Sequence, residues 1–242
     1  MQFAGLVLPL VLLQGGGKSE FKDVKVGDGI AAADFDIVSM EYTGKFTDGK
    51  VFDSSKKHGG KPFVFILGIH QVIKGWDQGV LGMKVGGKRK LTLPPDLAYG
   101  PGGTPDGTIP PNSTLVFDVE LKGVHKCDYK VLKAGSGEGA KMGDTLDIQY
   151  TGTFKDGKKF DSSFDRGTPM TIRLGRDRLV PGFVQALLGL KQGEKRKVDI
   201  PSDYAYGDGG VPNRAAGAAP GSYIIPPKAT LVFELELVRL YK

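Results

Sequence analysis

Residues that could perform chemistry in this chain of 242 residues are best sought among those that occur twice. Three segments of the first half return in the second half: 41–55 (EYTGKFTDGKVFDSS) as 149–163 (QYTGTFKDGKKFDSS), 93–100 (LPPDLAYG) as 200–207 (IPSDYAYG), and 109–121 (IPPNSTLVFDVEL) as 225–237 (IPPKATLVFELEL). A period this long indicates a duplicated domain, because solenoid repeats span only about 20–50 residues. Chemistry that both copies share should therefore use residues present in both.

The common forms of nucleophilic and metal chemistry are excluded as a shared function. The histidines and the single cysteine all precede residue 128, so the second copy has no Ser–His or Cys–His pair and no His or Cys ligand for a metal. The serine pairs that follow Asp53 and Asp161 are typical of turns rather than of nucleophiles. The glycines are not spaced as a phosphate-binding loop before a helix. We therefore expect no metal and no cofactor.

The residues that do recur are aromatic and apolar, with one carboxylate. They pair as Tyr42/Tyr150, Phe52/Phe160, Asp53/Asp161, Val72-Ile73/Leu179-Val180, Tyr99/Tyr206, Ile109/Ile225 and Phe117/Phe233. Each of them alone could simply be a core residue. Taken together, the tyrosines favour a pocket, because a buried hydroxyl needs a hydrogen-bond partner and these tyrosines stand beside turns.

An apolar pocket without acid, base or metal predicts either simple binding or a reaction that needs no proton transfer. Rotation about a peptide bond is such a reaction, and resonance gives it a barrier of roughly 18–20 kcal/mol. For X–Pro bonds the rotation is slow enough to limit folding. Because twisting the amide removes charge separation, a pocket of low polarity disfavours the planar form. Donors that reach the twisted carbonyl would lower the barrier further, and each ~1.36 kcal/mol is tenfold in rate.

The motifs YTGKFTDGKVFDSS, VIKGWDQGV, PPDLAYG and IPPNSTLVFDVEL together resemble the FKBP-type peptidyl-prolyl isomerases, in two tandem copies that cover most of the chain. The resemblance implies an α+β fold in which a curved antiparallel sheet, a half-barrel, wraps around one short α-helix in each copy. It implies peptidyl-prolyl cis–trans isomerase (rotamase) activity that assists protein folding. It also implies clefts that bind proline-containing polypeptides and macrolides of the tacrolimus and rapamycin type.

Carried onto this sequence, the resemblance assigns site residues in both copies. The catalytic residues would be Tyr42, Phe52, Asp53, Trp76, Tyr99 and Phe117 in the first copy, and Tyr150, Phe160, Asp161, Phe183, Tyr206 and Phe233 in the second. The substrate-binding residues would be Phe63, Val72, Ile73 and Ile109, and Arg166, Met170, Leu179, Val180, Ile224 and Ile225. Trp76 would form the floor, the Ile73 N–H and the Tyr99 hydroxyl would be donors, and Asp53 would face the twisted carbonyl or organise the wall.

The sequence departs from the family pattern in three places. The family often pairs an arginine with the pocket aspartate; the second copy has Arg166, whereas the first reads KKHGG at 56–60, so Asp53 is expected to lack that partner. The second copy has Phe183 at the floor and Met170 at an aromatic wall, and a smaller floor should weaken macrolide binding more than turnover. It also carries a Gly/Ala-rich insertion at about 208–223, which would gate large substrates or be idle. These differences favour an alternative, a non-catalytic module that binds proline segments or partner proteins in one or both copies.

The elements that position these residues are predicted to be mostly strands. Apolar residues alternate along 114–121, which is typical of a half-buried strand. Asp48-Gly49 and Asp156-Gly157 predict hairpin turns. Three-and-four spacing predicts one short helix from Ile73 and another from Val180. We expect two domains, 18–125 and 126–242, that touch or have limited reach.

Composition and the N-terminus bear on partners and compartment. The net charge of +6 is modest, and the basic clusters lie in predicted strands, as on a solvated sheet face, so no nucleic-acid partner is expected. The apolar start of 1–17 is too short for a transmembrane helix; it is either a targeting segment or an extension. The first alternative places the protein in the secretory pathway or an organelle lumen, and the second in the cytoplasm. We expect a monomer without a transmembrane span.

Overall fold

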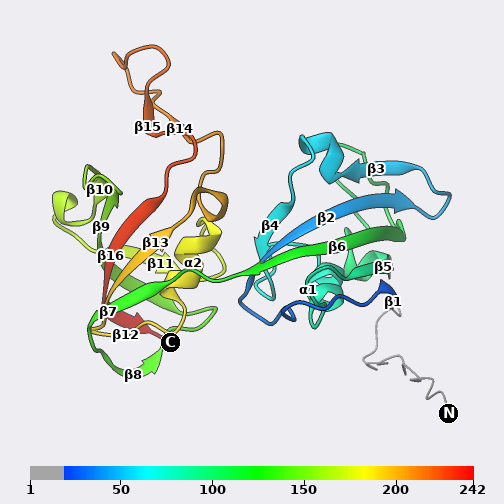
Figure 1. Ribbon diagram of the computed structural model, residues 1–242, viewed down its shortest axis with the longest axis horizontal. Coiled ribbons are helices and arrows are strands. Elements are labelled where there is room, and N and C mark those ends of the chain that lie inside the picture. Colours follow the sequence, from blue (N-terminus) through cyan, green and yellow to red (C-terminus); the bar gives the residue numbers. More distant parts are fainter. Residues whose placement is uncertain (1–18) are drawn as a thin grey trace.

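The computed structural model describes residues 19–242 (Figure 1). The segment 1–17, for which a targeting role is one alternative, lies outside the described residues. Within 19–242, two main antiparallel sheets each carry one short α-helix, which confirms the expected α+β class (Figure 1). No helix in this part of the chain is long and apolar enough to cross a membrane.

The first half forms a six-stranded sheet in the order β1-β5-β6-β2-β3, with β4 also paired to β2. Its strands are β1 (Glu20–Lys25), β2 (Ile37–Phe46), β3 (Val51–Ser54), β4 (Phe63–Ile66), β5 (Lys88–Leu93) and β6 (Leu115–His125). Its helices are α1 (Lys74–Val80) and the 3-10 turns η1 (Ser55–His58) and η2 (Pro95–Leu97). The helix α1 packs in the same buried cluster as the central strands.

The second half repeats this connectivity. Its six-stranded sheet runs β10-β9-β16-β13-β7, with β11 paired to β9. The strands are β7 (Tyr129–Lys133), β9 (Thr145–Phe154), β10 (Lys159–Ser162), β11 (Met170–Arg173), β13 (Lys195–Ile200) and β16 (Leu231–Tyr241). The helices are α2 (Pro181–Leu187), η3 (Phe164–Arg166) and η4 (Ser202–Tyr204). Two small pairs complete it: β8 (Ser136–Gly139) with β12 (Lys191–Gln192), and β14 (Val211–Pro212) with β15 (Tyr223–Ile225).

Local sequence explains most of these elements. The alternation predicted for 114–121 is confirmed, because every second residue of β6 from Leu115 to Leu121 is buried. The predicted turns are confirmed as well: Gly49 and Gly157 take φ of 89° and 84°, and each turn joins two paired strands. These positive φ values are what glycine permits at low cost.

Each helix lies close against its own sheet because a glycine faces a strand. A Cβ atom on Gly75 would stand 2.5 Å from Leu93 Cδ2, and one on Gly182 would stand 2.3 Å from Ile200 Cγ2. Neither distance is possible for a real side chain. Trp76 follows Gly75 in α1, and Phe183 follows Gly182 in α2. The close approach of each helix to its sheet therefore fixes how far each predicted floor residue lies from the strands.

The two halves share a buried contact, which we call the seam. Three buried residues of the first half, Ile37, Ile66 and Ile69, belong to the core cluster of the second, and the half-buried Val64 packs against it. On the other side, α2 contacts β2 and β4. The Gln185 amide on α2 donates to the carbonyls of Phe35 (3.2 Å) and His125 (3.4 Å), and its oxygen accepts the Cys127 N–H at 2.5 Å. Apolar burial and hydrogen bonds therefore hold the halves together.

Two further contacts cross the seam. The Lys61 ammonium pairs with the Asp208 carboxylate, which stands at the start of the insertion. The rings of His125 and Tyr204 lie with their centroids 5.1 Å apart. The segment 126–128 between β6 and β7 is short, and it is the chain connection between the two halves (Figure 1).

Candidate functional site

The aromatic residues predicted for the first cleft converge on α1; we call Tyr42, Phe52, Trp76 and Phe117 aromatic set 1. The Trp76 ring lies 5.2 Å from Tyr42 and 5.4 Å from Phe117 between centroids, both edge-on. Phe117 in turn lies 5.6 Å from Phe52 at 87°. Edge-to-face pairs at such separations are favourable. Strands β2, β3 and β6 thus place one ring each around the helix residue.

The remaining predicted residues of the first copy surround this set. Ile109 is buried in the same cluster, and Val72 and Ile73 pack against it. Phe63, at 43 % exposure, stands 6.1 Å from Trp76. The Ile73 residue precedes α1, and its N–H makes no backbone hydrogen bond within residues 19–242. A donor is therefore free at the position where the sequence predicted one.

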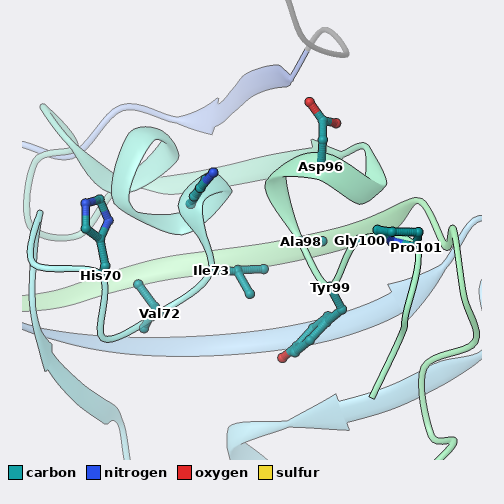
Figure 2. A pocket seen from close by; sticks show the side chains of 9 residues that line it. His70, Val72, Ile73, Asp96, Ala98, Tyr99, Gly100 and Pro101 are labelled. Carbon is teal, nitrogen blue, oxygen red and sulfur yellow. The ribbon is translucent and has the colours of Figure 1, made fainter. Parts of the chain in front are cut away.

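A hollow of about 510 Å³ opens beside aromatic set 1, and we call it the outer hollow (Figure 2). Val72, Ile73 and Tyr99 line it, together with His70, Lys74, Asp96, Ala98, Gly100 and Pro101. Figure 2 shows the Tyr99 ring lying beneath Ile73, while Asp96 points away on the far side. The outer hollow is thus lined by both residues that carry the predicted donors and by Val72, whereas none of the four rings of aromatic set 1 lines it.

The carboxylate of Asp53 stands at the rim and accepts several hydrogen bonds. The Tyr42 hydroxyl donates to Asp53 Oδ2 at 2.6 Å, and the Ser54 N–H donates to Oδ1 at 2.8 Å. His58 Nε2 lies 2.9 Å from the same Oδ1. Burial works to raise the pKa of Asp53, but the bonds from Tyr42 and His58 outweigh it and hold that pKa below its usual value. Asp53 is therefore an anion at neutral pH.

His58 is a residue that sequence reasoning missed. The prediction that Asp53 lacks an arginine is correct, but the imidazole of His58 takes the arginine's place. Its signal was available in the spacing, because His58 follows Asp53 at the same interval at which Arg166 follows Asp161. Both partners come from the 3-10 turn that succeeds the β-hairpin, η1 in one half and η3 in the other.

The second half assembles the matching rings, and we call Tyr150, Phe160, Phe183 and Phe233 aromatic set 2. Phe183 on α2 lies 4.8 Å from Phe233 and 6.2 Å from Tyr150 between centroids. Phe160 meets Phe233 at 5.5 Å and 89°. The phenylalanine floor is thus covered on the same sides as Trp76, with the Phe183–Phe233 separation smaller than the Trp76–Phe117 one.

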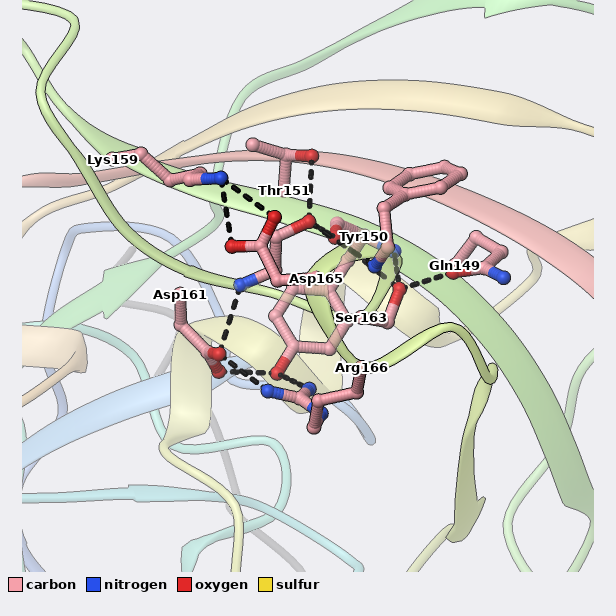
Figure 3. A network of polar contacts seen from close by, with 10 residues as sticks. Gln149, Tyr150, Thr151, Lys159, Asp161, Ser163, Asp165 and Arg166 are labelled. Atoms are coloured by element: carbon pink, nitrogen blue, oxygen red, sulfur yellow. Dashed lines mark hydrogen bonds and ion pairs between the residues drawn. The ribbon is translucent and has the colours of Figure 1, made fainter.

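The polar rim of the second half is a connected network (Figure 3). The Tyr150 hydroxyl makes a short bond to Asp161, while Arg166 donates to Asp161 Oδ1 at 2.5 Å and to the Tyr150 oxygen at 2.6 Å. Burial works to raise the pKa of Asp161, and the bonds from Tyr150 and Arg166 outweigh it, so that pKa is lowered. The buried Ser163 accepts the Tyr150 N–H at 2.8 Å, while Ser162 Oγ accepts the N–H of Phe164, two residues on, at 3.2 Å, as a turn serine does.

The four tyrosines of the two candidate sites stay protonated across the neutral range. Burial, and next the nearby carboxylate, raises the pKa of Tyr42 and of Tyr150 above the usual value. Burial likewise raises the pKa of Tyr99 and of Tyr206, with the charges of Asp53 and Asp161 adding to it. Each hydroxyl therefore remains a donor. In the described part of the chain, no group of three His, Cys, Asp or Glu residues is placed to hold a metal.

The substrate-binding residues predicted for the second copy differ in how deeply they are buried. Met170 on β11, Leu179 and Val180 pack against the core cluster, and Ile225 is buried within it. Ile224 is 49 % exposed on β15 and does not belong to that cluster. The hairpin of β14 and β15 stands out from the body of this half (Figure 1). Ile224 is thus placed on the projecting hairpin rather than among the rings.

Comparison with known proteins shows that one family model matches two separate regions of the chain. The family model described as FKBP-type peptidyl-prolyl cis-trans isomerase matches residues 29–122 and 137–238. Peptidyl-prolyl cis-trans isomerase FKBP9 of Bos taurus is 38 % identical over 210 residues, covering 84 % of this chain and 34 % of the relative. Peptidyl-prolyl cis-trans isomerase FKBP10 of Homo sapiens is 36 % identical over 212 residues, covering 85 % and 34 %. The chain spans about a third of the length of these curated relatives.

Among solved structures, the crystal structure of the three FKBP domains of wheat FKBP73 is similar to this chain. It is 28 % identical, covers 93 % of this chain and 95 % of its own, and gives a TM-score of 0.44.

Proposed function

Since the chain belongs to the family of FKBP-type peptidyl-prolyl cis-trans isomerases, we propose that it catalyses the cis–trans isomerisation of X–Pro bonds in polypeptides and so assists protein folding. The observation that carries this proposal is the repeated aromatic set with a tyrosine-bonded carboxylate at its rim and a free backbone donor beside it. The domains 18–125 and 126–242 would each hold one cleft.

The chemistry follows from the surroundings of the amide. A proline ring resting on Trp76 would carry its X–Pro bond to the mouth of aromatic set 1, where rings have replaced most of the water. The planar amide is dipolar, so this transfer costs it more than it costs the twisted form. Ile73 and Tyr99 line the outer hollow, and the N–H of Ile73 and the hydroxyl of Tyr99 would donate to the twisted carbonyl. The reaction needs no proton transfer, which is consistent with a site whose tyrosines stay protonated and whose carboxylate stays ionised at neutral pH.

Asp53 and Asp161 would act through the tyrosines that they bind. Each carboxylate accepts a hydrogen bond from the tyrosine hydroxyl of its own aromatic set. These bonds hold the rings of Tyr42 and Tyr150 at fixed angles to the floor residue. Ionised at neutral pH, neither carboxylate can serve as an acid. We assign them to the organisation of the wall, which is one of the two roles predicted for Asp53.

Macrolide binding is proposed for the first cleft above all. The larger floor of Trp76 offers more apolar contact than Phe183 does, and apolar area sets the affinity of such ligands. We expect the second cleft to bind macrolides more weakly while keeping turnover. The protein would act as a monomer on proline-containing polypeptides.

The test is a proline-peptide isomerisation assay on the full chain with one cleft altered at a time. Phe52→Ala and Phe117→Ala should lower turnover in the first cleft, and Phe160→Ala and Phe233→Ala in the second, with circular dichroism showing that the fold persists. A full chain that leaves the peptide at its uncatalysed rate would refute the proposal.

A second function is favoured by one observation, the divergence of the second cleft at Phe183 and Met170. In this case the second half binds proline segments or a partner protein without accelerating rotation. Peptide binding that Phe233→Ala abolishes, in a chain whose rate does not change with that substitution, is the result expected for such a module.

A further inference from the structure

A second hollow lies on the seam, between corresponding loops of the two halves; we call it the seam pocket. It has a volume of about 330 Å³. From the first half Ile69, His70 and Gln71 line it, and from the second half Gly175, Arg176, Asp177, Arg178, Leu179 and Val184. The first set precedes Val72-Ile73, and the second leads into Leu179-Val180. The loop that leads into Ile73 in the first half and the loop that leads into Val180 in the second therefore meet across this pocket.

Both loops are held in place by carboxylates. Asp77, only 8 % exposed, accepts the N–H of Gly68 at 2.9 Å and of His70 at 3.1 Å, and His70 Nδ1 lies 3.2 Å from it. In the second loop Asp177 accepts the Arg173 N–H at 2.8 Å. The seam contacts of Gln185 and the isoleucines fix one loop against the other. The seam pocket is therefore a built feature of the tandem.

The pocket lining carries two arginines, Arg176 and Arg178, and one carboxylate, Asp177, so positive charge exceeds negative charge by one. Arg176 and Arg178 form no ion pair with any residue of the described chain, so both guanidinium groups are available to a ligand. The one carboxylate on the lining, Asp177, already accepts a backbone N–H. His70 adds a third nitrogen-bearing group to the lining. A guanidinium with free donors recognises carboxylates in particular, because its fork matches their geometry.

His70 connects the seam pocket to the first cleft. Its side chain lines both the outer hollow and the seam pocket, and it is 80 % exposed between them. A polypeptide that passes Tyr99 and Ile73 in the outer hollow therefore has a direct route past His70 to the two arginines. An extended chain advances about 3.3 Å per residue, so the position of the acidic residue relative to the proline is the quantity that the experiment must find.

We propose that the seam pocket is a subsite for an acidic residue of the polypeptide bound in the first cleft, so that the second half supplies substrate specificity to the first. The proposal rests on the isomerase function proposed above. The substrate class it names is X–Pro segments with Asp or Glu near the proline.

The experiment compares otherwise identical proline peptides that carry Glu, Gln or Lys, in turn, at each position from the third before to the third after the proline. The full chain should favour Glu over Gln at one of these positions by about two- to fivefold in kcat/KM, as expected for exposed ion pairs. Lys should be disfavoured there. Added salt should shrink the preference, because exposed charges are screened.

Three variants locate the effect. The double substitution Arg176→Gln, Arg178→Gln should reduce the Glu/Gln ratio to about one, since the ion pair is its only source. Arg173→Gln, an exposed arginine of the same half that does not line the pocket, should leave the ratio intact. In a chain whose first cleft is disabled by Phe52→Ala and Phe117→Ala, the preference should disappear from the remaining activity.

The outcomes separate the two proposals. Equal rates for Glu and Gln peptides at every position overturn the subsite while the isomerase function stands. A preference that survives in the chain with the disabled first cleft overturns it as well, because the acidic residue then serves the second cleft. No acceleration of any peptide overturns the isomerase function, and with it the subsite.

Discussion

Replacing Tyr42 by Phe removes one hydroxyl and leaves the ring of aromatic set 1 in place. The lost bond is the 2.6 Å donation to Asp53 Oδ2. A hydrogen bond to a charged group contributes about 1.5–3 kcal/mol when it is buried. The Asp53 side chain is 36 % exposed, so water screens the bond and can replace part of it. We expect Tyr42→Phe to lower the free energy of unfolding by about 1 kcal/mol at neutral pH.

The pH dependence of this loss has a definite sign. Because the pKa of Asp53 is lower in the folded protein than in the unfolded chain, its contribution to stability is present above the unfolded pKa, about 3.9. That contribution is lost as pH falls through the folded pKa. Without the Tyr42 hydroxyl, the folded pKa of Asp53 rises toward the unfolded one. The stability difference between the parent protein and Tyr42→Phe should therefore be constant from about pH 7 to pH 5 and shrink below about pH 4.

Trp76 supplies the assay. It is the only tryptophan of the chain and lies 5.2 Å from the Tyr42 ring, so its fluorescence in urea reports on the surroundings of aromatic set 1. Tyr129→Phe, a half-exposed tyrosine of the second half, is the matched control and should leave the transition unchanged. A stability difference that stays the same at acid pH would show that the hydroxyl acts without the carboxylate, and the reasoning would be refuted.

Three other outcomes are expected. Trp76→Phe copies Phe183 and removes a buried indole N–H that has no partner in the described chain, so it should lower the free energy of unfolding in urea by less than about 2 kcal/mol. In the same variant, macrolide affinity measured by titration should fall more than turnover. A larger loss of stability would contradict this. Arg166→Ala removes a donor to Asp161 and should raise its pKa in a carbon-13 NMR titration; an unchanged value refutes that bond. Burial, with the charge of a neighbouring aspartate, raises the pKa of the Cys127 thiol to about 11, so a disulfide reagent should label the folded protein far more slowly than the unfolded one at pH 8.

The features that the sequence predicted are those that depend on short stretches of chain. The hairpin at Asp48-Gly49 needs only a residue that accepts positive φ between two alternating strands, and the alternation of β6 needs only one buried face. The duplication extended both conclusions to the second half. The family then supplied the closure of the rings around Trp76, which no single stretch contains.

The features that could not be predicted depend on two distant segments at once. The seam needs Ile37 and Ile66 to pack beside α2, yet within their own strands they look like ordinary core residues. Gln185 carries no sign that it accepts the Cys127 N–H. His58 is a different case, because it lies only five residues from Asp53, at the spacing that separates Arg166 from Asp161, and its imidazole occupies the place of the guanidinium. The roles of the site residues remain predictions.

The helix α2 links these two kinds of feature, since it faces both the second cleft and the seam. Phe183 turns toward the rings of aromatic set 2, while Gln185 on the same helix bonds to the carbonyls of Phe35 and His125 in the first half. A helix of 7 residues is too short to be stable alone, so packing on both sides must hold it. Removing the first half would leave α2 with one side exposed, and Phe183 would lose part of what fixes its angle to Phe233. The two clefts are therefore not structurally independent, because packing of the first half against α2 stabilises the position of Phe183 at the floor of the second cleft.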